Sequence, residues 1–550
     1  MSTLSLYICK CNGFSLLLCT MFLTIVLGCS HHKFSNKEYQ NTLAAYSNTT
    51  ETVDPIADLR IYQIMVESFQ NGDDSINYNI GLGPSDHKGD LQGVINALPY
   101  IRSLGMNAIW LTPIFEAEKL NTYPIPLDAT AYYTRDYYKI DRHFGDEKKL
   151  EELVQKAHSL GIYVFLDGVF GHFKGDLEDS SPSKKQVTKS NMCILPENLF
   201  EKESVLSNPV IRHTLCADYD DDGQTLEYYK EVASYYIKNF KIDGWRLDQA
   251  YQVPIDALRE LKKTVEAASK EVTYKDASGK DVNPLGYMVA ELWNPNDIIC
   301  QFGYGTNKDP ALNSAFDFQG RTAILETFAA TQSGVFSHKA TTLKDYLIDN
   351  EKTLPNHAYP NLMITNHDTV RLGDIIQRAD LNNTYKKRIK LALSFMALAH
   401  SGPITNYYGE EIGQEVKNFD KSQPHSYIYH DGMVARDNGK ISNFTKDEEE
   451  IKDLFEKLMK LRASHGALSN GQLEFLFVND SLFCIKKTFK NDKTFIYALN
   501  LDTDKENYIN IDKDVLKGRI TDEFAKDCFT LSDSLQIKIK PLDFVLLSGD

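Results

Sequence analysis

From about residue 58 onward, the apolar positions of the chain alternate between two patterns. Short apolar runs are typical of buried strands, and longer segments with an apolar residue every three or four positions are typical of amphipathic helices. Residues 91–104 are an example of the second pattern, with apolar positions at Leu91, Val94, Leu98, Ile101 and Leu104. Gly105 ends this predicted helix, and the apolar run 108–111 is the next predicted strand.

This unit of strand and helix repeats along the chain. The predicted strands are 59–64, 108–111, 162–167, 242–247, 287–291, 313–318, 362–365 and 404–407. The clearest predicted helices are 91–104, 147–160, 226–240 and 255–268. Such alternation predicts an α/β fold with a parallel sheet, and eight units favour a closed (β/α)8 TIM barrel over an open doubly wound sheet. No glycine-rich phosphate loop follows the first strand, which counts against a nucleotide-binding fold.

Two regions depart from this repeat. The long polar segment after Asp167, rich in Ser, Lys, Pro and Asp, predicts a small inserted subdomain after the third strand, at about residues 172–223, above the active-site face. Beyond residue 464, short alternating runs follow one another without helices. We therefore predict a catalytic barrel over residues 58–464 and a C-terminal antiparallel β-sandwich over residues 465–550.

The first residues have the pattern of an export signal. Lys10 precedes an apolar stretch from Phe14 to Leu27, which is too short for a comfortable membrane span. Residues 1–28 are therefore predicted to be a signal peptide, and residues 29–57, polar and rich in Asn, Thr and Ser, a flexible tether. Cys29 directly follows Gly28 and resembles the acylated cysteine of bacterial lipoproteins. We expect an exported protein whose lipid anchor on Cys29 holds it at the bacterial membrane, on its periplasmic or cell-surface face; an ordinary signal peptide cut nearby is the alternative.

Composition excludes some partners. The formal net charge of -16 argues against nucleic acid, whose binding depends on clustered Lys and Arg. Of the nine cysteines, four lie in residues 1–29, and the spacing of the others matches no metal template. Cys193 and Cys216 could pair in the inserted region, or both could remain free thiols.

Three short motifs each place a carboxylate at the end of a predicted strand. They are residues 244–248 with Asp248, residues 289–293 with Glu291, and residues 365–368 with Asp368. The carboxyl ends of parallel barrel strands meet at one face, so these three acids should converge on one cavity. Glycoside hydrolysis needs such a cluster.

The neighbours of these acids indicate different roles. Arg246 is two residues from Asp248 on one strand, so both side chains point the same way. A guanidinium should lower the pKa of Asp248 and keep it ionised as a nucleophile, although a purely structural ion pair is the alternative. Apolar neighbours and nearby negative charge should raise the pKa of Glu291, as a general acid requires. Asp368 can accept hydrogen bonds from sugar hydroxyls.

The chain resembles glycoside hydrolase family 13, the α-amylase family, over about residues 58–550. The four signature segments occur in order at 167–172, 244–248, 291–293 and 366–368, with supporting segments at 69–73, 89–93, 136–141 and 408–413. The resemblance implies that Asp248 is the nucleophile, Glu291 the acid and base, and Asp368 a group that binds the distorted sugar ring. It further implies that Arg246 orients Asp248, that His172 and His367 contact the sugar, and that Tyr132 stacks on it.

Several positions differ from the family pattern. Gly171 stands where members usually have Asn, and Tyr251-Gln252 stands where many endo-acting members have Lys-His. Because that Asn and that His help to hold an inter-domain calcium ion in many members, we predict that this calcium site is absent. The missing Lys-His also counts against a typical starch-degrading endo-amylase. Thr130-Ala131 replaces the frequent His-Gly before Tyr132, which changes the hydrogen bonding expected at that subsite.

A second calcium site is a candidate after the first strand. Asn71, Asp73, Asn77 and Asp90 partly match a calcium loop that some members carry, and closely spaced oxygen ligands suit calcium. A solvated polar turn is the alternative. The acidic run 218–223 lacks the acid expected at the twelfth position of a calcium loop, where Tyr229 stands, and is predicted to be a solvated loop.

Taken together, the three acids and the resemblance to the α-amylase family imply a retaining α-glycosidase without an organic cofactor. The resemblance implies α-glucan or maltooligosaccharide substrates and an enzyme of the maltodextrin or neopullulanase type. A transglycosylase differs only in whether water or a sugar hydroxyl attacks the covalent intermediate. A non-catalytic glucan-binding scaffold would be expected to have lost one or more of the three acids, and all three are present.

Overall fold

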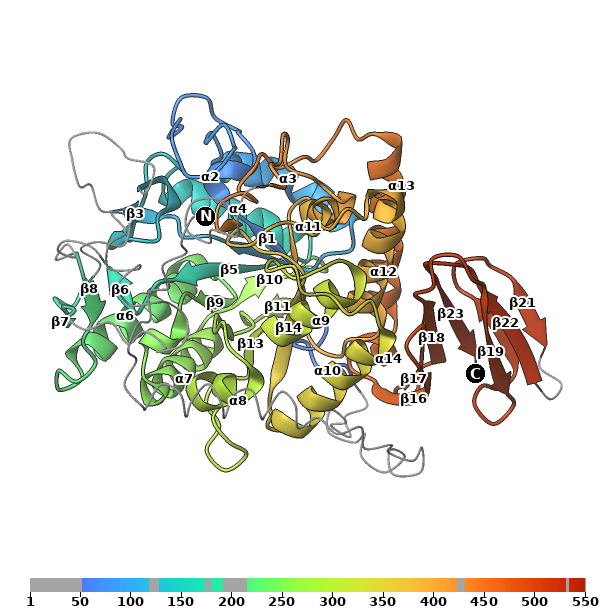
Figure 1. Ribbon diagram of the computed structural model, residues 1–550. Helices are drawn as coiled ribbons and strands as arrows, with labels where there is room; N and C mark the ends of the chain where they lie inside the picture. Colours follow the sequence, from blue (N-terminus) through green and yellow to red (C-terminus); the bar gives the residue numbers. More distant parts are fainter. Residues whose placement is uncertain are drawn as a thin grey trace, which may run out of the picture. The chain divides into compact units, whose positions relative to one another are not determined.

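The computed structural model describes residues 52–117, 128–173, 180–190, 215–422, 431–530 and 534–549 (Figure 1). Cys29, the predicted signal peptide and residues 29–51 of the predicted tether lie outside this part. The end of the predicted tether contacts the barrel, since Ala57 is fully buried and the Tyr359 hydroxyl donates to Asp54 Oδ2 at 2.7 Å. Within the described residues, no helix combines the length and apolar character that crossing a bilayer requires.

Eight parallel strands close into a barrel, which confirms the predicted fold. They are β1 (Arg60–Ile64), β2 (Ala108–Leu111), β5 (Tyr163–Gly168), β9 (Gly244–Leu247), β12 (Tyr287–Ala290), β13 (Ser314–Asp317), β14 (Tyr359–Met363) and β15 (Ile404–Tyr407). Neighbours in the barrel follow chain order, and β1 closes it by pairing with both β2 and β15. Each of these strands overlaps a predicted apolar run, least in β14, which shares only residues 362–363 with the predicted strand 362–365.

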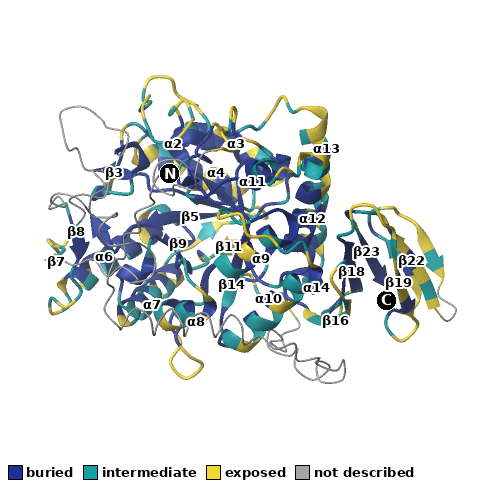
Figure 2. Cartoon of the chain, in the orientation of Figure 1, coloured by how far each residue is buried: buried dark blue, intermediate teal, exposed yellow. Residues whose placement is uncertain are grey.

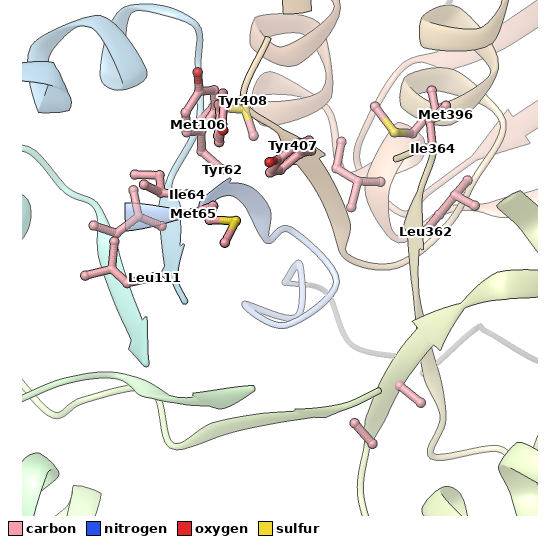
Figure 3. Close-up of a cluster of buried hydrophobic side chains, with 14 of the residues drawn as sticks. Tyr62, Ile64, Met65, Met106, Leu111, Leu362, Ile364, Met396, Tyr407 and Tyr408 are labelled. Atoms are coloured by element: carbon pink, nitrogen blue, oxygen red, sulfur yellow. The ribbon is translucent and has the colours of Figure 1, made fainter. Parts of the chain in front are cut away.

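The strands have two apolar faces, as parallel strands covered on both sides must. One face of alternate residues packs into the barrel interior, and it includes Ile61, Trp110, Phe165, Val289 and Phe316. The opposite face packs against the surrounding helices, as Figure 3 shows for Tyr62 and Ile64 of β1, Leu111 of β2 and Leu362 of β14. Figure 2 shows the barrel strands almost entirely buried.

Helices surround this barrel. Their bounds are α2 (Val66–Phe69), α3 (Leu91–Ser103), α4 (Glu147–Ser159), α6 (Gln224–Phe240), α7 (Ile255–Glu271), α8 (Asn296–Ile299), α9 (Phe318–Phe328), α10 (Ala340–Thr353), α11 (Leu372–Arg378), α12 (Tyr385–Leu398), α13 (Lys446–Ser464) and α14 (Gly466–Ser469). The starts of α3 and α4 are fixed by Asp90 and Asp146, whose carboxylates accept from the backbone N–H three residues on. The start of α13 is a capping box formed by Thr445 and Glu448.

Two short antiparallel sheets lie in the connections after β2 and β5. One pairs β3 (Phe115–Ala117) with β4 (Thr134–Ile140), and the sequence patterns did not predict it. The other joins β6 (His172–Phe173), β7 (Lys189–Ser190) and β8 (Leu215–Ala217), in the region predicted to be an inserted subdomain. Cys216 on β8 is disulfide-bonded, whereas Cys193 lies outside the described residues, so their pairing stays a prediction.

The C-terminal region is antiparallel, as predicted. A six-stranded sheet has the order β16 (Gln472–Val478), β17 (Leu482–Thr488), β18 (Thr494–Asn500), β23 (Asp543–Gly549), β20 (Arg519–Asp522) and β21 (Cys528–Thr530). A two-stranded sheet pairs β19 (Asn507–Asp512) with β22 (Ser534–Ile539), and an apolar core that includes Ile496, Ile509 and Leu547 joins the two sheets. The barrel contacts this region through α12, where Ser394 Oγ lies 2.7 Å from the Tyr497 hydroxyl.

Candidate active site

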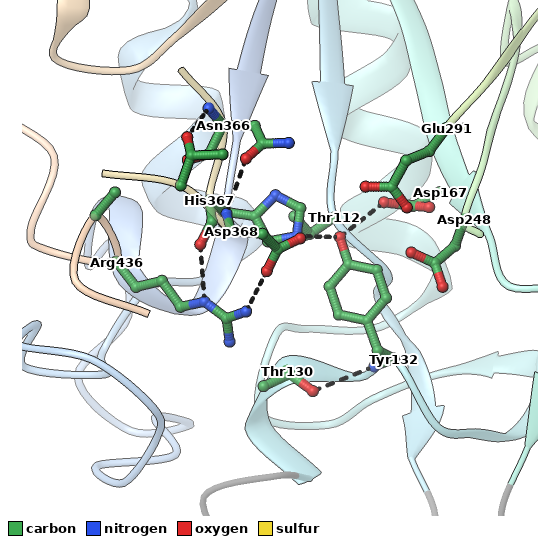
Figure 4. A network of polar contacts seen from close by, with 12 residues as sticks. Thr112, Thr130, Tyr132, Asp167, Asp248, Glu291, Asn366, His367, Asp368 and Arg436 are labelled. Atoms are coloured by element: carbon green, nitrogen blue, oxygen red, sulfur yellow. Dashed lines mark hydrogen bonds and ion pairs between the residues drawn. The ribbon is translucent and has the colours of Figure 1, made fainter. Parts of the chain in front are cut away.

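Strand ends bring the predicted site residues to one face of the barrel. Asp167 lies on β5 and Arg246 on β9, at paired positions of the two strands. Asp248 follows β9, Glu291 follows β12, and Asp368 lies beyond the end of β14. Figure 4 shows Asp167, Asp248 and Glu291 grouped on one side of the site and His367, Asp368 and Arg436 on the other, with Tyr132 between them.

Arg246 is the centre of the first group. Its guanidinium lies 2.7 Å from Asp167 Oδ1, 2.7 Å from Asp248 Oδ1 and 2.8 Å from Glu291 Oε1. The Arg246 side chain is fully buried, and the surrounding carboxylates raise its pKa well above the usual range despite that burial. One cation therefore holds three carboxyl groups in fixed positions, which supports the prediction that Arg246 orients Asp248.

The electrostatics of this group differ in part from the prediction. Burial raises the pKa of Asp248 to about 7, and although Arg246 opposes this effect, as predicted, it does not outweigh burial. The expectation of a lowered pKa at Asp248 is therefore wrong, because the residue is far more desolvated than a strand-end position suggests. The predicted rise at Glu291 is confirmed: burial raises its pKa to about 8, and nearby Asp248 and Asp368 contribute in the same direction.

Asp368 has a different environment from the other two acids. Its carboxylate lies 3.1 Å from His367 Nε2 and accepts from Arg436 at 2.6 Å. Burial alone would raise the pKa of Asp368, but the neighbouring groups lower it below the usual range. Since burial also lowers the pKa of His367 to about 3, that ring is neutral at pH 7, and Arg436 supplies the stabilising charge.

Tyr132 connects the two groups. Its hydroxyl donates to Asp167 Oδ2 at 2.9 Å and lies 2.8 Å from His367 Nε2. Its ring is parallel to the His367 ring, with centroids 5.3 Å apart. Gln63 contacts the other side of His367, with its Nε2 atom 2.7 Å from His367 Nδ1. Tyr132 therefore lies within the site, as predicted.

His172 is the second predicted histidine of the site, and it lies near Asp248. It belongs to β6, and its Nε2 atom is 3.9 Å from Asp248 Oδ2 while its Nδ1 atom is 2.8 Å from Gln252 Oε1. A Cβ atom at Gly171 would lie 2.4 Å from Gln252 Cβ, so glycine is needed here for the close approach of Gln252. The two departures from the family pattern at Gly171 and Gln252 are therefore in contact.

Three residues of the site were not among the predicted site residues. Asp167 is the first residue of the first signature segment, and for Gln63 a polar residue inside a predicted apolar strand was the available signal. Arg436 lies in an irregular segment far along the chain from Asp368, and no sequence period indicates it. The structure brings together all the residues predicted for the sugar site: Asp248, Glu291, Asp368, Arg246, Tyr132, His172 and His367.

The loop of the second candidate calcium site is organised around Asp90. Its carboxylate accepts from the backbone N–H groups of Gly72, Asp73 and Gly93, at 2.9, 2.8 and 2.7 Å. Asp73 accepts from Ser75, and Asn71 donates to Asp74. Asn77 Oδ1 is a buried oxygen without a hydrogen-bond partner among the described residues, which suits a cation ligand. No group of three His, Cys, Asp or Glu side chains in the described part of the chain is arranged to hold a metal ion.

Comparison with known proteins identifies the family. Residues 63–194 and 218–471 match the family model of the alpha-amylase catalytic domain, which is more than half of the chain. The chain belongs to the alpha-amylase family. It is therefore a glycoside hydrolase with the (β/α)8 barrel of that family.

Curated relatives and solved structures agree with this placement. A cyclomaltodextrinase of Thermoanaerobacter pseudethanolicus is 31% identical over 481 residues, which cover 84% of this chain and 74% of the relative. An intracellular maltogenic amylase of Bacillus subtilis is 27% identical over 509 residues, covering 89% and 76%. Among solved structures, a variant of AmyP in complex with maltotriose has a TM-score of 0.82 and 39% identity, and it covers 90% of this chain and 97% of its own.

Proposed function

We propose that this enzyme cleaves α-glucan oligosaccharides by a double displacement in which Asp248 is the nucleophile and Glu291 the acid and base. The observation that carries this proposal is the Arg246 guanidinium, which bonds both carboxyl groups and keeps them on one side of the site. The raised pKa of Glu291 suits a group that must be protonated at neutral pH. The names of the relatives and the maltotriose complex of AmyP support the substrate class.

The roles follow from the environment of each acid. Glu291 protonates the leaving oxygen while Asp248 attacks the anomeric carbon, and Glu291 then deprotonates the water that releases the sugar. Asp368, whose lowered pKa keeps it ionised, accepts hydrogen bonds from ring hydroxyls, and these strengthen as the ring distorts. Arg246 orients Asp248, while Tyr132, His172 and His367 line the pocket for the reacting sugar.

Transglycosylation is the second candidate within the same chemistry, because a sugar hydroxyl could replace water at the second step. Incubation of the purified enzyme with maltoheptaose and with pullulan distinguishes these outcomes. Short maltooligosaccharides or panose-like fragments would support hydrolysis, and products longer than the starting sugar would support transfer. No change in either sugar, together with measurable sugar binding, would support a non-catalytic scaffold instead.

Asp248→Asn tests the nucleophile directly. Turnover should fall by at least about a thousandfold, because an amide cannot form the covalent intermediate, while oligosaccharide binding stays measurable. Asp256→Asn is a matched control, since that carboxylate lies on the surface of α7 with 88% of its side chain exposed. If Asp248→Asn retains the activity of the control, the assignment of the nucleophile is wrong.

We further propose that the protein is an exported lipoprotein anchored through Cys29. The support is the order of basic residue, apolar stretch and Gly28-Cys29 in the sequence. In a bacterial host, palmitate labelling should depend on Cys29 and disappear in Cys29→Ala, whereas Cys19→Ala should leave it intact. Labelling that survives Cys29→Ala would place the anchor elsewhere, and unlabelled wild-type protein would indicate an ordinary signal peptide.

We also propose that the protein binds a calcium ion, with Asn71, Asp73, Asn77 and Asp90 as the ligands. The buried oxygen of Asn77 supports it, and the involvement of Asp90 in three backbone hydrogen bonds limits what that residue can contribute. Such an ion would stabilise the loop and take no part in the chemistry. At the position of the inter-domain calcium site, Gln252 offers only a neutral amide oxygen next to Gly171. The absence of this inter-domain calcium site stays a prediction.

A further inference from the structure

Two buried glutamines contact the two histidines of the site, each through the Nδ1 atom of the ring. Gln63 presents its Nε2 atom to His367 Nδ1 at 2.7 Å. Gln252 presents its Oε1 atom to His172 Nδ1 at 2.8 Å. An amide nitrogen only donates and an amide oxygen only accepts, so the two glutamines impose opposite protonation on the two rings.

For His367, the surrounding network is consistent with a proton on Nε2. The Tyr132 hydroxyl uses its own proton to donate to Asp167, so towards His367 Nε2, 2.8 Å away, its oxygen accepts. Asp368 Oδ2, which only accepts when ionised, is 3.1 Å from the same nitrogen. His367 Nδ1 is then the lone-pair nitrogen that accepts from Gln63.

For His172, the network fixes the opposite arrangement. Gln252 Nε2 donates to Gln249 Oε1 at 2.9 Å, and the Tyr251 hydroxyl donates to the same oxygen at 2.9 Å. Because the Gln252 amide nitrogen faces Gln249 Oε1, its oxygen is the atom that faces His172 Nδ1, and that ring nitrogen carries the proton. Nε2, which lies 3.9 Å from Asp248 Oδ2, then carries the lone pair and can accept a hydrogen bond from a ligand.

The segment that carries Gln252 is itself fixed to the catalytic acid. The backbone N–H of Gln249 donates to Glu291 Oε2 at 3.1 Å, and that of Ala250 donates to the Glu291 carbonyl at 3.0 Å. Gln249 has a left-handed backbone, with φ of 39°, which turns the chain so that Gln252 reaches Gly171 and His172. The position of His172 is thus linked to that of Glu291 through residues 249–252.

We infer that Gln252 is a positioning residue that holds His172 in the Nδ1–H tautomer, the opposite of His367. The consequence rests on the proposed function: His172 accepts a hydrogen bond from a sugar hydroxyl beside Asp248, whereas His367 donates. One wall of the sugar pocket then offers an acceptor and the other a donor, and this pair selects the orientation of the hydroxyls between them.

Nuclear magnetic resonance of the protein labelled with ¹⁵N-histidine tests this inference without substrate. Two-bond ¹H–¹⁵N correlations report which ring nitrogen is protonated, and His172→Asn and His367→Asn assign the two signals. We expect an Nδ1–H pattern for His172 and an Nε2–H pattern for His367. An Nε2–H pattern for His172 in the wild-type protein would overturn the inference, whatever the activity of the enzyme.

Variants of the two glutamines provide the matched comparison. Gln252→Met should alter only the His172 signal, and Gln63→Met only that of His367. Gln252→Glu keeps an acceptor at His172 Nδ1 and should retain the Nδ1–H pattern.

The same variants have a kinetic readout. For maltoheptaose, Gln252→Met should raise KM about tenfold, and Gln252→Glu should bring KM back towards the wild-type value. A His172 pattern that is unchanged in Gln252→Met would contradict the positioning role. If the wild-type protein shows both expected patterns but does not turn over maltoheptaose, that result counts against the proposed function instead.

Discussion

At the scale of single residues, the three acids of the site differ in pKa because their environments differ, not because of their residue types. Asp248 and Glu291 share Arg246 with Asp167, so one cation serves three buried carboxyl groups, and burial raises the pKa of Asp248 and of Glu291. Asp368 has Arg436 as its own partner, and its pKa is lowered. The motifs identified these acids because carboxylates at strand ends are visible in a sequence. The degree of burial, which sets the pKa of Asp248, depends on how segments far apart in the chain pack around it, and a motif does not contain that information.

These pKa values predict the pH dependence of the reaction. Asp248 must lose its proton to attack, so kcat/KM should fall on the acid side of its pKa of about 7. Glu291 must keep its proton to donate, so kcat/KM should fall on the alkaline side of its pKa of about 8. A bell-shaped profile with its maximum between these values is expected for maltooligosaccharides. With an aryl glycoside whose leaving group needs no acid, Glu291→Gln should lose the alkaline limb; an alkaline limb that persists would assign it to another group.

At the scale of elements, the sequence patterns predicted the barrel strands well because each is a short apolar run between polar turns. They missed β23, whose residues are almost continuously buried in the middle of its sheet, so that no alternation is visible. They also missed α12, where most of the residues are buried and the helical period is lost. The strands β3 and β21, of three residues each, are too short to form a pattern. In β20 only Ile520 is an apolar residue, so it forms no apolar run.

Gly244 decides whether β9 and β12 can pair at the start of the two strands. A Cβ atom there would lie 1.9 Å from the Tyr287 carbonyl oxygen, and the φ of 155° lies outside the range that other residues prefer. Gly244→Ala should therefore lower the free energy of unfolding by about 3 kcal/mol or more, since backbone must move. Gly279, with φ of 81° and no atom near the added Cβ, is the control: Gly279→Ala should cost only about 1 kcal/mol. Chemical denaturation measures both, and equal losses would contradict the steric argument.

At the scale of the whole molecule, calcium should make only a modest contribution to stability. The candidate ligands Asn71 and Asp73 lie in one surface loop, and Asp90, which holds that loop, already makes three hydrogen bonds to its backbone. A strong chelator should therefore lower Tm by a few degrees at most, and Asp73→Ala should remove that difference. Unfolding of the protein in chelator would show that an ion holds larger parts of the molecule together.

Arg462 on α13 joins the barrel to the C-terminal region. Its buried guanidinium donates to the carbonyl oxygens of Ala397 at the end of α12, His400 before β15 and Leu468 in α14, at 2.8, 2.8 and 2.9 Å. From the C-terminal sheet, Lys487 on β17 donates to the same Leu468 oxygen at 3.0 Å. Three segments therefore meet at one cation. Removing it takes a donor from each of these buried carbonyl groups, and Lys487 still reaches those of His400 and Leu468.

Arg462→Met should consequently lower the free energy of unfolding by about 3 kcal/mol, a loss typical of a disrupted buried polar network. Lys460→Met, on the same helix but with an exposed ammonium group paired to Glu456, should change it by less than about 0.5 kcal/mol. Calorimetry adds a sharper readout. Loss of the Arg462 hydrogen bonds should also separate the unfolding transition of the C-terminal sheet from that of the barrel. A single transition with an unchanged Tm in Arg462→Met would mean that apolar packing between α12 and the sheet, around Ser394 and Tyr497, suffices to hold the two regions together.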